Sequence, residues 1–103
     1  MTGGRYGFAA AVLVALAGAN GVAAQDYEAR SWAASCASCH GTDGRTKNDI
    51  PALAGRSKAD LLAVLKEFKG GQRKTATIMH QYAVGYSDQQ LERIADHFSR
   101  QPR

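Results

Sequence analysis

The stretch SCASCHG, residues 35–41, holds both cysteines of the 103-residue chain and one of its three histidines. If this stretch is helical, Cys36, Cys39 and His40 fall on one face, because residues three and four positions apart are neighbours on a helix. The pattern C-x-x-C-H is typical of covalent haem attachment. Two thiols form thioether bonds to the haem while the histidine reaches its iron. The motif therefore predicts haem c, bound through Cys36 and Cys39, with His40 as an iron ligand.

Three other uses of paired cysteines fit the rest of the chain less well. A thiol oxidoreductase carries its C-x-x-C beside a βαβ unit, whereas this sequence predicts helices without a sheet. A structural zinc site needs four ligands, and the motif would need a distant fourth. A disulfide between Cys36 and Cys39 would close too small a loop to stabilise the fold much. The thiol oxidoreductase remains the alternative from another functional class.

The first 24 residues have the layout of a secretory signal peptide. Arg5 precedes an apolar run at residues 8–19, and small residues follow at 22–24. The run is too short to span a bilayer comfortably, although an uncleaved N-terminal anchor is the alternative. We expect cleavage near Gln25 and export to the periplasm. The remaining residues, 25–103, would form one domain without a membrane-spanning segment.

Charge and size limit the functions open to this domain. Thirteen Lys and Arg against nine Asp and Glu give the whole chain a net charge of +4, which suits an acidic partner surface. No long basic run is interleaved with aromatic residues, so nucleic-acid binding is not predicted. A domain this small has a thin core and commonly needs a disulfide, a metal or a cofactor to stabilise it.

Residues 57–71 give the clearest helix signal. Ser57 can cap the first turn, and Gly70 can supply a left-handed exit. Apolar side chains recur at the spacing of one helix face: Leu61, Val64, Leu65 and Phe68.

Residues 86–102 repeat this design, with Ser87 and Gln90 able to form a capping box. We expect a further helix over about 27–39, through the cysteine motif, and a short helix within 75–85. No pair of strands is predicted, so the fold class is all-α with three to four helices. The apolar stripe of the last helix is Leu91, Ile94, Ala95 and Phe98.

An iron held by His40 has a second axial position, which needs a ligand if it is not to stay open. Met79 is the only methionine left once Met1 departs with the signal peptide. It lies on a separate segment that could close over the haem. The alternatives are His80, which normally points elsewhere on the same turn, and His97, which reads as a boundary residue of the last helix.

The order of three motifs along the chain resembles class I cytochromes c. CASCHG, IPALAG and TATIM precede a C-terminal amphipathic helix, and the resemblance covers essentially all of residues 25–103. It implies a small fold in which the first and last helices cross, wrapped around one covalently bound haem. It also implies His40 and Met79 as axial ligands. The carbonyl of Pro51 would accept a hydrogen bond from the His40 ring nitrogen that is not bound to iron, which fixes the ring.

The stretch LKEFKGGQRKTATIMHQYAVGYSDQQLERIADHF, residues 65–98, is most similar to the cytochrome subunits of flavocytochrome c sulfide dehydrogenases. This resemblance implies an electron-transfer protein that is not an enzyme on its own. It also implies an FAD-containing flavoprotein subunit as partner. The alternative is a free diffusible monohaem cytochrome that serves several redox partners.

Basic residues flank the expected haem pocket and raise two hypotheses. Some could contact the haem propionates, and together they could form a docking surface, although such residues are most often simply solvated. The propionate candidates are Arg56, Arg73 and Lys74. The docking candidates are Arg45, Lys47, Lys69, Arg73 and Lys74.

Overall fold

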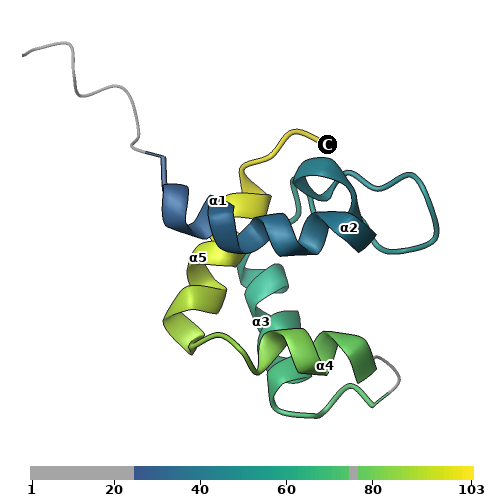
Figure 1. Cartoon of the computed structure of the whole chain (residues 1–103), viewed down its shortest axis with the longest axis vertical. Helices are drawn as coiled ribbons and strands as arrows, with labels where there is room; N and C mark the ends of the chain where they lie inside the picture. The colour runs from purple at the N-terminus through teal and green to yellow at the C-terminus, as the bar shows by residue number, and fades with distance from the viewer. Residues whose placement is uncertain (1–24, 75–76) are drawn as a thin grey trace, which may run out of the picture.

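Residues 25–74 and 77–103 are described by the computed structural model and form a helical domain (Figure 1). The predicted signal peptide, residues 1–24, lies outside the described residues, as do residues 75–76. No strand occurs among the residues described, and the all-α prediction is confirmed. None of the helices in this part of the chain is long and apolar enough to cross a membrane.

The predicted first helix is present but not uniform. Helix α1, Tyr27–Ala33, continues through a 3₁₀ turn, Ala34–Cys36, into helix α2, Ala37–His40. Gly41 ends α2 with a φ of +84°. A Cβ atom at Gly41 would lie 2.7 Å from the backbone of Thr46, so this exit needs glycine. The cysteine motif thus ends at a sharp turn.

Helix α3, Lys58–Lys69, begins as predicted: the Ser57 hydroxyl accepts a backbone N–H of the first turn at 3.0 Å. Its exit differs from the prediction. Gly70 keeps a right-handed conformation with φ −80°, because its N–H still bonds to the Lys66 carbonyl at 2.9 Å. The left-handed residue is Gly71, with φ +81°.

The two remaining helices lie where the sequence places them. The short helix α4, Thr77–Ala83, falls within the predicted range, and α5 spans Asp88–Ser99. The capping box of α5 is confirmed. The Ser87 hydroxyl accepts the Gln90 N–H at 3.1 Å, and the Gln90 side chain accepts the Ser87 N–H at 2.8 Å.

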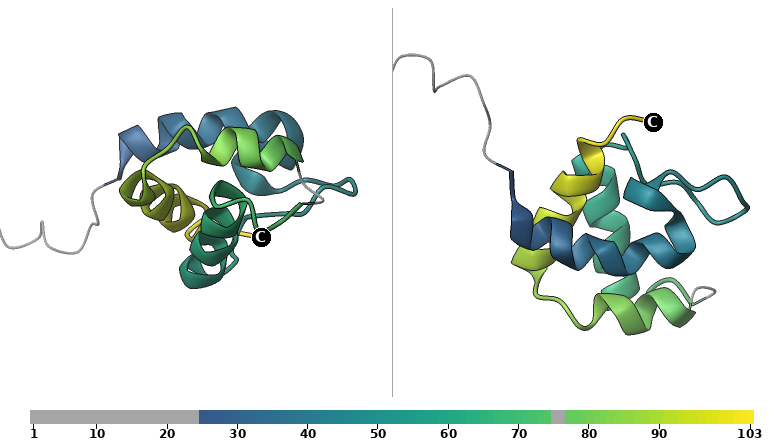
Figure 2. Two further views of the ribbon diagram at one scale, coloured as in Figure 1. Left: turned by 90° about the horizontal axis from the view of Figure 1, so that it is seen from below. Right: turned by 45° about the horizontal axis from the view of Figure 1, so that its top comes forward.

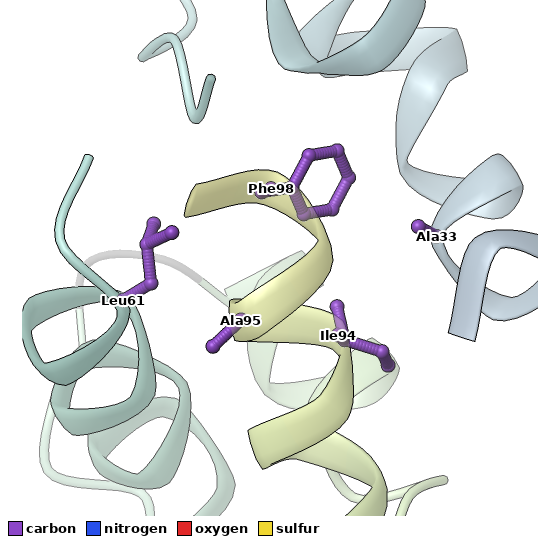
Figure 3. Packing of buried hydrophobic residues seen from close by; sticks show 5 residues of the cluster. All are labelled: Ala33, Leu61, Ile94, Ala95 and Phe98. Carbon is purple, nitrogen blue, oxygen red and sulfur yellow. The ribbon is translucent and has the colours of Figure 1, made fainter. Parts of the chain in front are cut away.

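Helix α5 packs against α1 on one side and α3 on the other (Figures 1 and 2). Ala95 points toward Leu61 of α3, whereas Ile94 and Phe98 point toward the side on which Ala33 of α1 lies (Figure 3). These five residues form the buried cluster of the domain. The pairing of the first and last helices is therefore the one that the class I resemblance implies.

A polar clamp closes the same pair of helices at its outer edge. Arg93 of α5 donates two hydrogen bonds of 2.7 Å to the Asp26 carboxylate and one of 2.8 Å to Glu28. Its guanidinium also lies 4.7 Å from the centre of the Trp32 ring, within the range of a cation–π interaction. Asp26 caps α1 by accepting the Ala29 N–H at 3.0 Å. The hydrogen bonds from Arg93 lower the pKa of Asp26 to about 2.

The core contains few large side chains. The large buried apolar residues among those described are Leu61, Leu91, Ile94 and Phe98, and the other buried apolar residues are alanines. The apolar stripe of α5 is fully buried, but the rest of the α3 stripe stays half-buried. A core this thin leaves apolar surface for a cofactor to cover.

Candidate haem site

The two cysteines lie at the end of the first helical stretch as free thiols, Cys36 half-buried and Cys39 exposed. Cys36 packs against the buried cluster that α5 and α3 form. Burial raises the pKa of the Cys36 thiol. A catalytic thiol in an oxidoreductase has a lowered pKa instead, so the environment of Cys36 does not favour that alternative.

His40 is held by the loop that follows the cysteine motif. Its Nδ1 lies 2.7 Å from the carbonyl oxygen of Pro51. Because a carbonyl only accepts, Nδ1 carries the hydrogen and donates it, and this hydrogen bond assigns the tautomer. The Nε2 atom is then left with a free lone pair, which is the form in which an imidazole binds a metal.

Gly44 holds the loop that carries Pro51. Its carbonyl accepts the N–H groups of Leu53 at 2.8 Å and Ala54 at 3.2 Å. Gly44 has φ +80°, and a Cβ atom there would lie 2.9 Å from both Leu53 Cβ and Phe98 Cδ1. The sequence analysis did not single out this glycine, whose one signal is an Asp-Gly turn pair. The orientation of His40 thus depends on a close contact with α5.

Met79 lies half-buried on α4, which packs against α3. Helices α2 and α4 both lie on the side of α3 that faces away from α5 (Figures 1 and 2). The fold therefore places α2, which carries Cys39 and His40, and α4, which carries Met79, on the same side of α3 although they are far apart in sequence.

The two rival histidines have contacts elsewhere. His80 Nδ1 lies 2.7 Å from the carbonyl oxygen of Phe68 in the last turn of α3. His97 is half-buried, and its ring packs edge-on against Phe98 with centroids 5.2 Å apart. Burial lowers the pKa of His97. Met79 remains the expected second ligand.

A family model described as cytochrome c matches residues 29–99. This chain belongs to the cytochrome c family. It is accordingly an electron-transfer protein that carries covalently bound haem c.

Three relatives are similar in sequence to this cytochrome. It is 42% identical over 64 residues to the cytochrome subunit of sulfide dehydrogenase from Chlorobaculum tepidum, and the matched stretch covers 62% of this chain and 57% of that protein. It is 41% identical over 69 residues to cytochrome c-554(548) from Halomonas halodenitrificans, covering 64% and 83%. It is 39% identical over 70 residues to cytochrome c4 from Pseudomonas aeruginosa, covering 67% and 34%. The cytochrome thus matches little more than half the length of the sulfide dehydrogenase subunit.

The residues present on the expected haem side suit this cofactor. Two free thiols and an imidazole with an available Nε2 occur on one helical stretch. Apolar side chains that a protein normally buries are exposed nearby in sequence: Ile78 is 63% exposed and Ile50 is 37% exposed.

The three propionate candidates do not lie together. Arg73 pairs with Glu67 at 2.7 Å and shares a pocket of about 270 Å³ with Lys74. Arg56 lines a different pocket, of about 330 Å³, together with Arg45. The structure therefore separates Arg56 from the other two candidates.

Proposed function

We propose that Cys36 and Cys39 form the thioether bonds to haem c and that His40 and Met79 are its axial ligands. The hydrogen bond of 2.7 Å between His40 and Pro51 carries this assignment, because it leaves Nε2 as the free nitrogen. The haem supplies reversible one-electron chemistry at its iron. The protein holds it, orients the His40 ring and fills the second axial position. With both positions filled, no place for substrate remains on the iron, so the cytochrome is not an enzyme on its own.

Substitution of Met79 tests the ligand assignment. A thioether ligand raises the reduction potential relative to a second histidine and gives the oxidised protein a weak far-red sulfur-to-iron absorption band. Met79→Ala is expected to abolish that band and lower the potential. His97→Gln, which changes a rival ligand, is the control and should leave both unchanged. Loss of the band in the control variant alone would contradict the assignment.

We further propose that the cytochrome is exported to the periplasm as residues 25–103. The charge, apolar run and small residues at 1–24 support this. Mass spectrometry of the purified protein should find an N-terminus near Gln25. A chain that keeps its first residues and stays with the membrane fraction would instead support the uncleaved anchor.

The electron donor that we propose is the FAD-containing flavoprotein subunit of a sulfide dehydrogenase. The 42% identity to a cytochrome subunit of sulfide dehydrogenase carries this proposal. Oxidation of sulfide releases electrons as a pair. A flavin accepts the pair and passes the electrons on singly, and a six-coordinate haem accepts one electron at a time without binding substrate.

Surface charge supports docking of an acidic partner. Among the docking candidates, Lys69 pairs with Asp88 at 3.1 Å, Arg73 with Glu67 at 2.7 Å and Arg45 with Asp43 at 3.7 Å. These pairs are solvent-exposed, so each contributes little to stability. Carboxylates of a partner can therefore replace them at little cost. Association should weaken as ionic strength rises.

Reduction by sulfide tests the partner. Mixed with sulfide and the flavoprotein, the cytochrome should be reduced rapidly, and the two proteins should elute together in gel filtration at low salt. With sulfide alone, reduction should be slow. Lys74→Glu should slow reduction by the flavoprotein at low salt but not at high salt. Lys58→Glu is the matched control, because it reverses a charge on α3 outside the docking candidates, and it should leave the reduction rate unchanged.

A free carrier is the second candidate. The match to cytochrome c-554(548), which extends over 83% of that protein and whose name includes no enzyme complex, favours it. Rapid reduction by several unrelated donors, without a stable complex in gel filtration, would support the free carrier over the subunit.

A further inference from the structure

His80 follows the proposed ligand Met79 directly and bonds to a different helix. Its Nδ1 lies 2.7 Å from the carbonyl oxygen of Phe68. Because that oxygen only accepts, Nδ1 is the donor. One side chain thus ties α4 to the last turn of α3, beside which α4 lies in Figure 1.

The Phe68 carbonyl is available because it lies at a helix end. The last four carbonyls of a helix have no partner within the helix. At the end of α3, the Lys66 carbonyl accepts a backbone N–H from beyond the helix at 2.9 Å, and the Glu67 carbonyl accepts another at 3.0 Å. The Phe68 carbonyl accepts the Gly71 N–H at the longer distance of 3.2 Å. The bond from His80, at 2.7 Å, is therefore the shorter of its two hydrogen bonds.

Helix α4 buries few large apolar side chains among its described residues. It contains seven residues. Its large apolar side chains Ile78 and Tyr82 are 63% and 43% exposed, and Ala83 is the buried one, at 1%. A helix that buries so little apolar surface is held weakly by packing. The hydrogen bond across to α3 then adds to the packing that anchors this helix.

This anchoring acts on Met79 through helix geometry. Successive residues on an α-helix point about 100° apart, so fixing the direction of His80 also fixes the direction in which Met79 leaves the helix. A methionine side chain has three rotatable bonds and adapts easily. Its sulfur stays in place only if its backbone does.

His80 also borders a basic stretch of the surface. It lines the pocket of about 270 Å³ together with Gly71, Arg73, Lys74 and Gln81. The bond to Phe68 makes the ring an anchor of α4. Like His40, His80 keeps a free Nε2, so the far-red band of the His80 variants tests whether it is also a ligand.

We propose that His80 is a positioning residue for the methionine ligand: its hydrogen bond to the Phe68 carbonyl holds Met79 on the iron against competing ligands. This rests on the assignment of Met79 proposed above. Movement of α4 away from α3 releases Met79 for another ligand to bind, and that movement breaks this bond. The hydrogen bond thus keeps the open state rare and lowers the apparent affinity of any competitor.

Imidazole binding to the oxidised holoprotein measures that open state. His80→Leu removes the donor, whereas His80→Asn keeps an N–H donor at the same number of bonds from Cα. Loss of one such hydrogen bond should make imidazole bind His80→Leu roughly two- to ten-fold more tightly than wild type. His80→Asn should bind imidazole within about two-fold of wild type. Without imidazole, the far-red band should persist in both variants.

Two controls separate positioning from general stability. Gln81→Ala changes the neighbouring exposed residue on α4 and should not alter imidazole affinity. Arg93→Leu breaks the clamp between α1 and α5, so it should lower the denaturation midpoint and leave imidazole affinity unchanged.

Several outcomes would overturn the positioning role. The first is an imidazole affinity of His80→Leu equal to that of wild type. The second is an equal gain of imidazole affinity in His80→Leu and His80→Asn. The third is a gain of imidazole affinity in Arg93→Leu as large as that in His80→Leu. Failure of the ligand assignment looks different: the wild-type protein would lack the far-red band before any imidazole is added, and both proposals would fall together.

Discussion

The corner where α1, α3 and α5 meet is held together differently from the side that carries α2 and α4. At the corner, Phe98 and Ile94 are 3% exposed, and Arg93 makes three short hydrogen bonds to Asp26 and Glu28 at the start of α1. On the other side, His40 and His80 are each fixed by one bond to a main-chain carbonyl, and Ile78 is 63% exposed. The polypeptide therefore stabilises the corner through its own side chains, and the other side is the one on which we propose that the haem completes the packing.

The largest effect should come from removing the covalent attachment. In the Cys36→Ser, Cys39→Ser double variant, only axial ligands would hold the haem, and acid protonates the histidine. All haem colour should then leave the chain on acid–acetone extraction, whereas none should leave the wild type. Ser35→Ala with Ser38→Ala is the matched control, because it changes the same helical stretch and keeps both thiols. Colour that stays with the double cysteine variant would refute attachment through these residues.

Truncating the corner should have the next largest effect. Phe98→Ala removes a ring that is 3% exposed, so it should lower the free energy of unfolding by about 3–5 kcal/mol in denaturant titrations. Tyr27→Ala removes an aromatic ring that is 70% exposed and should change that free energy by no more than about 0.5 kcal/mol. Similar losses in the two variants would mean that the corner is not the main source of stability.

Gly44 joins the two regions, so its substitution should affect both. Gly44→Ala places a Cβ 2.9 Å from Leu53 and Phe98 at a φ of +80°. Left-handed strain and overpacking together should lower the free energy of unfolding by about 2–4 kcal/mol. The same change should shift the reduction potential, since it displaces the loop that holds His40.

Gly85→Ala is the matched control for that experiment. A Cβ at Gly85 would meet its nearest neighbour, the Tyr82 carbonyl oxygen, at 3.4 Å, an ordinary contact. Its cost should stay below about 1 kcal/mol, and the potential should not move. A stability loss without a change of potential in Gly44→Ala would show that the two regions are independent.

The smallest effect concerns pH and the clamp at α1. The pKa of Asp26 is lowered from 3.8 to about 2, mainly by the hydrogen bonds from Arg93. A carboxylate with a depressed pKa contributes stability above its unfolded-state value and loses it as pH falls through the folded-state value. In denaturant titrations at a series of pH values, the stability difference between wild type and Asp26→Asn should therefore be constant well above pH 3.8, fall between pH 3.8 and about 2, and vanish only below that. In the Arg93→Leu background, which lacks these hydrogen bonds, the same Asp26→Asn change should show no such window.

Sequence patterns predicted the features of this cytochrome that depend on neighbouring residues. The stripes and caps of α3 and α5 follow from spacing of three and four residues, and C-x-x-C-H is a local signature of haem attachment. The exit of α3 was misplaced by one residue, because Gly70 and Gly71 are both compatible with a turn and only the hydrogen bond to Lys66 decides between them.

Contacts between distant segments could not be predicted in the same way. Asp26 and Arg93 are 67 residues apart, and neither has a local pattern that names the other. The bond from His80 to Phe68 depends on where α3 ends and how α4 lies beside it. Gly44 resembles any glycine in a turn until Leu53 and Phe98 are placed around it. These residues decide how the site is held, while the motifs decide which residues form it.

The distance along the chain between the two halves of the Asp26–Arg93 clamp also has a consequence for the order of assembly. Asp26 precedes Arg93 by 67 residues, so this contact forms only when the two ends of the domain come together. Until α5 packs against α1, Cys36 is not yet packed against the buried cluster that half-buries it in the folded domain. In the unfolded chain both thiols are therefore open to covalent chemistry, and folding then half-buries Cys36 while Cys39 stays exposed.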